Sequence, residues 1–163
     1  MFRKNNDKPK LIKTLRYEDA RGLFTKVDIN QLDDFKIIEV FSSTSNLHVL
    51  RGMHFQNAMG IWQRKIVTVI QGEILDVIVN INPSSKDYKK VNKYILNSKS
   101  NSLFIPGNYA HGFLTLTDTA IVQYLCDQHH STSESGILWD SIDFQWPIIQ
   151  PILSDRDQKH EEL

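Results

Sequence analysis

Short runs of β-branched and other apolar residues, separated by turn-forming residues at intervals of roughly 8–12 positions, dominate the middle of this chain. The clearest are KIVTVI at 65–70 and EILDVIVNI at 73–81, which Gln71 and Gly72 join as a hairpin. Further runs fall at 47–56, 92–97, 102–107, 111–116 and 120–126. No long segment carries the 3.6-residue apolar period of a helix. Short, evenly spaced strands therefore predict an all-β sandwich or barrel.

The length and charge of the chain narrow its architecture and partners. Its 163 residues fit one domain, 1–163, with polar ends at 1–12 and 158–163 that we expect to be flexible. Lys plus Arg and Asp plus Glu both total 19, so the formal net charge is zero. A nucleic-acid polymer or an anionic membrane selects a basic excess, and neither is therefore an expected partner. A small charged ligand needs only a few local charges and stays open.

Cysteine content and the N-terminal sequence indicate a compartment. The single cysteine, Cys126, excludes an intramolecular disulfide framework and a metal site built on paired cysteines. The N-terminal residues are charged and lack the apolar core of a signal peptide, and no apolar run is long enough to span a bilayer. A reducing cytoplasm is the expected location.

Two histidines stand beside glycines in predicted strands. His54 lies in RGMHFQ at 51–56, and His111 lies in IPGNYAHGF at 105–113. Glycine permits close approach of a ligand or of another backbone segment. A metal held by both histidines and Asp76 is one interpretation, but the close H-x-H pair typical of single-strand metal sites is missing. We therefore expect no metal. Asp76, at the centre of an apolar run, reads equally well as a solvated, outward-facing carboxylate.

Eight segments in a fixed order resemble one known family. They are DARGLF (19–24), VLRGMHFQ (49–56), KIV (65–67), GEILDV (72–77), IPG through AHGF (105–113), ESGI (134–137), WP (146–147) and LSDRD (153–157). The chain is similar here to the dTDP-4-dehydrorhamnose 3,5-epimerases, nucleotide-sugar epimerases of the cupin group, over about residues 15–157. The resemblance implies a double-stranded β-helix, or cupin jelly roll, and a homodimer that exchanges N-terminal strands.

The resemblance also implies a reaction. The substrate class is a nucleoside-diphosphate 4-keto-6-deoxyhexose, with dTDP the expected nucleotide, and the product feeds a deoxysugar such as that of an O-antigen. The ketone at C4 acidifies the hydrogens on C3 and C5, so a base can remove one of them to form an enolate. A proton then returns to the opposite face of the carbon. The reaction uses no cofactor.

Several residues match the family's catalytic positions. His54 matches the base, since a neutral imidazole suits proton abstraction near pH 7. Asp157 matches the carboxylate that orients this histidine, and Lys65 matches a cation beside the ketone oxygen, where it would stabilise the enolate. Asp76 and His111 match a polar pair that lines the pocket.

Other residues match substrate-binding positions. Arg51 and Gln56 lie beside the base, Arg21 matches an arginine that reaches a pyrophosphate from the neighbouring subunit, and Phe24 matches a residue near the nucleotide base. Arg51 and His54 are three positions apart, which in an ideal strand puts them on opposite faces. A β-bulge at Gly52 would bring both side chains to one site.

The chain departs from the family before the ESGI segment. The family places a tyrosine there as the opposing acid, whereas this chain has His129 and His130 and no tyrosine after Tyr124. A histidine could serve as the acid, the reaction could be confined to one carbon, or the protein could bind a nucleotide sugar without turning it over. A 3,4-ketoisomerase of the same barrel group is a further alternative. Lys26 and Glu39 also depart from the family and leave the base of the nucleotide open.

Overall fold

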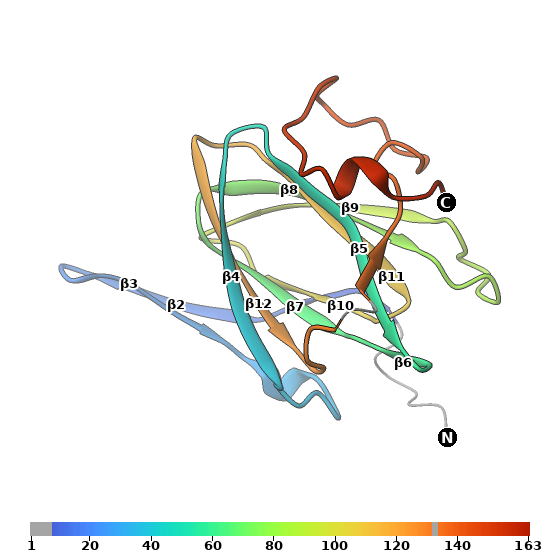
Figure 1. The fold of residues 1–163 in the computed structure, drawn as a ribbon. Coiled ribbons are helices and arrows are strands. Elements are labelled where there is room, and N and C mark those ends of the chain that lie inside the picture. The colour runs from blue at the N-terminus through green and yellow to red at the C-terminus, as the bar shows by residue number, and fades with distance from the viewer. Residues whose placement is uncertain (1–7, 132–133) are drawn as a thin grey trace.

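The computed structural model describes residues 8–131 and 134–163. Over these residues the regular secondary structure is almost entirely β, as predicted, and the two helices are single 3-10 turns (Figure 1). None of the described helices is long and apolar enough to cross a membrane. The elements are β1 Lys10–Ile12, β2 Thr14–Asp19, β3 Gly22–Val27, η1 Ile29–Gln31, β4 Glu39–Asn46, β5 Leu50–Ala58, β6 Ile61–Trp62, β7 Lys65–Gln71, β8 Glu73–Asn80, β9 Val91–Asn97, β10 Ser102–Ile105, β11 Tyr109–Thr115, β12 Thr119–Cys126, β13 Glu134–Gly136 and η2 Asp157–Lys159.

Two antiparallel sheets form the body of the molecule. One has the strand order β1-β10-β7-β12-β4, and the other has the order β13-β5-β11-β8-β9 with β6 paired to β5. Chain neighbours β7 and β8, which the sequence joins as a hairpin, lie in different sheets, so the Gln71-Gly72 connection is a corner between sheets and not a hairpin turn. The predicted double-sheet architecture is confirmed, while that local pairing is wrong because periodicity does not reveal a strand's partner.

The strand β8 is buried on both faces. Ile74 and Ile78 point into a core between the two sheets, and Val77 and Val79 belong to a second core on the outer face of the sheet. Residues after β13 cover that outer face with apolar side chains, among them those of residues 137–153. This cover explains the near-continuous apolar run of β8. Asp76 alternates with these valines and shares the inner face of β8 with Ile74 and Ile78, so its side chain is 0% exposed and is not a solvated surface carboxylate.

The polar C-terminal segment, for which we expected a loose tail, packs against the sheet. Leu138 N–H donates to the carbonyl of Glu161 at 2.7 Å, and Leu163 N–H donates to Oγ of Ser141 at 3.1 Å. The side chain of Leu163 joins the outer core. Figure 1 shows this segment, in red, lying against the sheet that contains β5, β8 and β9. A few anchoring contacts fix a segment whose composition alone suggests solvation.

The N-terminal segment, which we also expected to be flexible, is partly packed against the sheet. Residues 1–7 of the expected flexible segment 1–12 lie outside the described residues, but β1 pairs with β10 and the side chain of Ile12 is fully buried. The β2–β3 hairpin that follows projects from the body of the molecule (Figure 1). It presents the exposed apolar side chains of Tyr17, Leu23 and Phe24.

Candidate active site

A bulge in β5 brings two of the predicted site residues to one place. In the pairing of β5 with β11, His54 lies opposite His111 and Arg51 lies opposite Phe113. Over this stretch β5 therefore contains one more residue than β11, which defines a β-bulge. Gly52 sits within this irregularity at φ +143°, a conformation that favours glycine. The predicted bulge is confirmed. Arg51 and His54 consequently line the same cavity despite their odd spacing.

That cavity has a volume of about 270 Å³ and is bounded by both sheets. Strands β4 and β12 supply one wall, β5 and β11 supply the other, and β13 closes one side. Its volume is at the lower end of the range for small-molecule sites. The lining residues are Phe41, Ser43, Arg51, His54, His111, Phe113, Tyr124 and Glu134.

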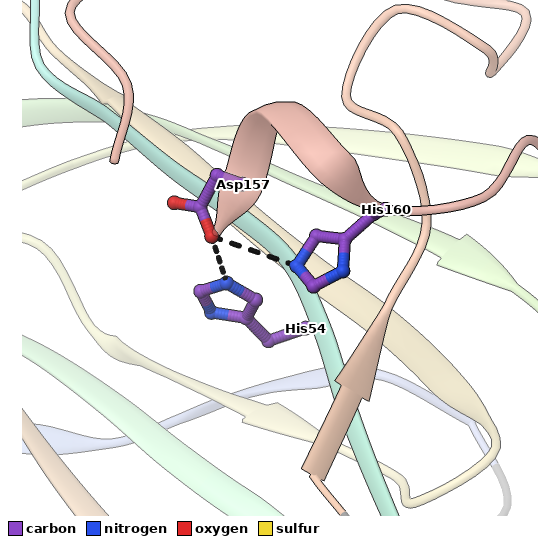
Figure 2. Close-up of side chains that lie close together, drawn as sticks. All are labelled: His54, Asp157 and His160. Atoms are coloured by element: carbon purple, nitrogen blue, oxygen red, sulfur yellow. Dashed lines mark hydrogen bonds and ion pairs between the residues drawn. The ribbon is translucent and has the colours of Figure 1, made fainter. Parts of the chain in front are cut away.

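The imidazole of His54 meets a carboxylate from the C-terminal segment. Nε2 of His54 lies 2.6 Å from Oδ1 of Asp157, which sits at the start of η2 (Figure 2). The N–H of Gly52 donates to the other carboxylate oxygen at 3.4 Å. Burial would raise the pKa of Asp157, but the hydrogen bond and charge of His54 and the Gly52 N–H bring it below its usual value. Asp157 is therefore an anion that can hold the imidazole in one orientation and stabilise its protonated form.

A second carboxylate–imidazole pair lies deeper in the molecule. Nε2 of His111 lies 2.7 Å from Oδ2 of Asp76, and both side chains are buried. Oδ1 of Asp76 has no hydrogen-bond partner among the described residues. The His111 ring also packs edge-on against Tyr124, with ring centroids 6.3 Å apart. This pair gives the cavity a fixed polar wall, because a buried carboxylate with one strong partner has little freedom to turn.

Lys65 is a buried cation at the start of β7. It pairs with Cys126 in the β7–β12 ladder. Burial lowers the pKa of Lys65, while Cys126, Glu134 and Asp76 act in the opposite direction. The influence of Glu134 and Asp76 places the ammonium group within electrostatic reach of two residues at or behind the cavity wall. A cation in such a low-dielectric position interacts strongly with a developing anion.

Tyr124 is a cavity residue that the sequence analysis did not include among the candidate site residues. It lies on β12, opposite the β5 wall that carries His54, and its ring stacks on Phe41 at 4.7 Å between centroids. Burial raises the pKa of the Tyr124 hydroxyl, so the group stays protonated at neutral pH. The signal that could have found it is the strand pattern, in which Val122, Tyr124 and Cys126 share the inward face of β12.

The two histidines proposed as substitutes for the acid lie elsewhere. His129 and His130 are exposed, the His130 side chain at 62%, and neither lines the cavity. Gln56 holds the backbone of this segment: its amide donates to the carbonyl of His129 at 2.8 Å and accepts from Ser131 N–H at 3.0 Å. Glu39 accepts the N–H of His130 at 2.8 Å. Gln56 is thus committed to a structural contact in this chain.

Arg21 and Phe24 lie at the far end of the β2–β3 hairpin, away from the cavity. Arg21 forms an exposed ion pair with Asp19 at 2.6 Å, and Phe24 is largely exposed. Both border a separate groove of about 400 Å³ on the hairpin itself. Within one chain the structure brings together His54, Asp157, Arg51 and His111, with Lys65 and Asp76 buried close behind, but not the hairpin residues.

The comparisons with known proteins agree with this geometry. The family model for dTDP-4-dehydrorhamnose 3,5-epimerase matches residues 7–163. This chain belongs to that family. A dTDP-4-dehydrorhamnose 3,5-epimerase of Methanothermobacter thermautotrophicus is 36% identical over 160 residues, which cover 90% of this chain and 85% of the relative.

Solved structures of the epimerase family share the whole fold. The Bacillus anthracis dTDP-4-dehydrorhamnose 3,5-epimerase, with TDP and PPi bound, has a TM-score of 0.88 and 34% identity, covering 98% of this chain and 96% of its own. The Legionella pneumophila dTDP-6-deoxy-D-glucose-3,5-epimerase, in complex with dTDP-4-keto-L-rhamnose, has a TM-score of 0.87 and 29% identity, covering 97% and 89%. The cupin jelly roll expected from the resemblance is thereby confirmed.

In this epimerase-family chain one cluster has the ligand types of a metal site. Ligand atoms of His54, Asp157 and His160 lie within 4.8 Å of one another (Figure 2). However, the two closest atoms, Nε2 of His54 and Oδ1 of Asp157, already share a proton at 2.6 Å. A metal would have to displace that proton and break the pair. The contacts therefore suit proton transfer better than metal coordination.

Proposed function

We propose that this protein is an isomerase that inverts C3, C5 or both in a nucleoside-diphosphate 4-keto-6-deoxyhexose, as a step of deoxysugar biosynthesis. The observation that carries the proposal is that a carboxylate-bound histidine, His54, and a buried, protonated tyrosine, Tyr124, line opposite walls of one cavity. Inversion of a carbon needs a base on one face and an acid on the other. Family membership supports the same reaction.

His54 removes the proton in this mechanism. Its Nε2 donates to Asp157, which leaves Nδ1 of the neutral ring free to accept the hydrogen of C3 or C5. The electrons of the broken C–H bond move into a C–C double bond, and negative charge develops on the C4 oxygen. Asp157 stabilises the imidazolium that forms.

Tyr124 returns a proton to the opposite face. Its hydroxyl is held protonated by burial, and the stacked ring of Phe41 fixes its orientation. The O–H bond breaks as the new C–H bond forms, so the enolate collapses back to the ketone with inverted configuration. Tyrosinate and imidazolium then exchange protons with water to restore the enzyme. This assignment replaces His129 and His130 as the acid.

Charge on the ketone oxygen and on the diphosphate is balanced by other groups. We propose that Lys65 stabilises the enolate oxygen, supported by its buried position near Asp76 and Glu134. Arg51 lines the cavity and is held by Oγ of Ser45 at 2.9 Å, so its guanidinium is oriented to meet a phosphate.

The β2–β3 hairpin supports a homodimeric assembly. Its exposed apolar side chains favour burial against a partner surface, and Arg21, the pyrophosphate arginine expected from the family, does not line the cavity of its own chain. We propose that the hairpin of one subunit covers the cavity of the other, with Arg21 on the diphosphate and Phe24 near the base of dTDP. The TDP bound by the Bacillus anthracis relative favours this nucleotide.

Solvent exchange tests the reaction. The protein is incubated in D₂O with dTDP-4-keto-6-deoxyglucose, and the sugar is followed by proton NMR. We expect deuterium at C3, C5 or both, together with signals of an inverted carbon. Absence of exchange at either carbon with dTDP-, UDP-, CDP- and GDP-linked sugars, combined with tight binding of one of them, would identify a non-catalytic binding protein. A moved carbonyl would identify a ketoisomerase.

Light scattering and nucleotide titration test the assembly. We expect a dimer of the 163-residue chain, and a Phe24→Asp change in the hairpin should shift it towards monomer and weaken dTDP binding. A matched change at the exposed Ile149, away from the hairpin, should do neither. A monomeric wild-type protein that binds dTDP normally would overturn the subunit arrangement.

A further inference from the structure

A third titratable side chain touches the His54–Asp157 pair. Nε2 of His160 lies 3.6 Å from Oδ1 of Asp157, the same oxygen that binds His54 (Figure 2). The His160 ring stands edge-on to the His54 ring, with centroids 5.6 Å apart and planes at 78°. No sequence motif singles out this residue, which stands in a charged C-terminal stretch. Its side chain is nevertheless only 11% exposed.

The position of His160 is constrained from both sides. A Cβ added at Gly136 would lie 2.4 Å from Nε2 of His160, so the ring occupies space that any other residue at 136 would fill. Gly136 is the partner of His54 in the β13–β5 ladder, which sets the ring directly beside the base. The next residue, Glu161, forms a bridge with Ile137. The fold therefore delivers this imidazole to one place and leaves it little room to leave.

The buried nitrogen of His160 has an unmet need for a partner. Nε2 has no hydrogen-bond partner among the described residues, although it is shielded from solvent. A buried polar group without a partner is costly, and the acceptor that it faces is Oδ1 of Asp157. The charged groups around it are His54 on β5, and Asp157 and Arg156 at the start of η2. Burial and the neighbouring His54 lower the pKa of His160, so the ring is a neutral donor at pH 7.

We propose that His160 is a positioning residue of the epimerisation: it holds Oδ1 of Asp157 against Nε2 of His54 and excludes water from that contact. The proposal rests on the proposed function of His54 as the base. When His54 takes up the substrate proton, the positive charge is stabilised by Oδ1 of Asp157. Nε2 of His160, 3.6 Å from this oxygen and without a hydrogen-bond partner among the described residues, restrains the carboxylate from rotating away as the charge moves. A dry contact also strengthens the ionic interaction.

Two variants of His160 separate positioning from packing. His160→Leu keeps apolar bulk and removes the N–H, whereas His160→Gln keeps an amide N–H near the place of Nε2. We expect His160→Leu to lower kcat by about tenfold with KM nearly unchanged, as for loss of a group that positions a catalytic side chain, and His160→Gln to recover most of the activity. His48→Asn is the matched control, because His48 is an exposed histidine outside the cavity. Thermal unfolding verifies that each variant is folded.

Proton NMR tests the effect of His160 on the His54–Asp157 contact without relying on catalytic activity. The proton shared by His54 and Asp157 should give a far-downfield proton NMR signal, and its exchange with water should be faster in His160→Leu than in the wild type or His160→Gln. Equal exchange rates, equal kcat values, or equal losses in both variants would overturn the proposal. If the wild-type protein lacks solvent-exchange activity, the proposed function fails, while the proton signal still decides whether His160 protects the pair.

Discussion

Nε2 of His54 and Oδ1 of Asp157 lie 2.6 Å apart although the residues are 103 positions apart in the chain. His54 belongs to the six-stranded sheet, and Asp157 arrives from a segment that crosses the outer face of that sheet. The contact forms only when this segment is packed, because no local interaction joins the two residues. Assembly of the His54–Asp157 pair is thus tied to completion of the fold.

Replacing Asp157 by Asn should disable the base without unfolding the protein. An amide keeps the size of the carboxylate but loses the charge that stabilises the His54 imidazolium, and it can fix the wrong tautomer of the ring. We expect kcat for epimerisation to fall by roughly 10²- to 10⁴-fold, with little change in the Kd for dTDP. Steady-state kinetics and calorimetric titration measure the two quantities. Asp155→Asn is the matched control, and comparable activity in both variants would contradict this role.

Replacing Tyr124 by Phe should uncouple exchange from inversion. The ring can still stack on Phe41, but the hydroxyl that supplies the opposing proton is gone. We expect inverted product to fall by roughly 10²- to 10⁴-fold. Deuterium should still enter the substrate with retained configuration, because His54 can return a proton to the face from which it took one.

The two exposed histidines provide the comparison for Tyr124. A double His129→Gln, His130→Gln variant should retain epimerisation within about twofold, since neither side chain lines the cavity. Nuclear magnetic resonance of the product distinguishes retention from inversion in both variants. Loss of inversion in the double variant, with normal inversion in Tyr124→Phe, would return the acid to the histidine segment.

Replacing Gly52 by Ala should destabilise the protein strongly. An alanine Cβ would lie 2.5 Å from Cα of Gly112, and the backbone at φ +143° disfavours a side chain. Gly60 is a control at φ +83° with open space around it, so Gly60→Ala isolates the backbone term, about 1 kcal/mol. We expect Gly52→Ala to cost more than about 3 kcal/mol in urea unfolding. Equal losses would show that the close approach is unimportant.

Stability should depend on pH in two separate windows. The pKa of Asp157 is lowered by folding, so its contribution is complete above about pH 4 and is lost as the pH falls through the folded value. The pKa of His160 is also lowered, so the unfolded chain binds a proton that the folded chain does not, and stability falls as the pH drops below about 6.5. Urea midpoints at pH 7.5 and 5.5 should therefore converge in His160→Gln. An unchanged difference would contradict the His160 assignment.

The positions of the strands could be predicted from the sequence, because alternation of apolar residues and turn-forming residues are local properties of the chain. Segments such as 65–70 and 120–126 became strands with nearly the expected limits. The strands that pair with β7 and β8 could not be predicted in this way, because a strand's neighbour in a sheet depends on contacts distant in sequence. The burial of Asp76 was hidden for the same reason, because its side chain faces the opposite sheet and pairs with His111, 35 positions away in the chain.

The candidate site likewise has features that the local sequence predicts and features that depend on tertiary packing. The odd spacing of Arg51 and His54 sufficed to predict the bulge, because this follows from strand geometry, whereas the role of His54 as a base is implied by the family motif and stays a prediction. The sequence offered His129 and His130 as one of several explanations for the missing acid, but neither lines the cavity, where the inward face of β12 places Tyr124. A position beside a motif says little about which way a side chain points.

The sequence by itself determined the all-β class and the family, because these depend on local patterning and on short motifs in a fixed order. Only the tertiary structure decided how the groups around His54 come together. Tyr124 reaches the cavity through the packing of two sheets, and Asp157 and His160 reach His54 through a C-terminal segment held by Ile137 and Leu163. These contacts join parts of the chain far apart in sequence, so their formation depends on burying a shared core.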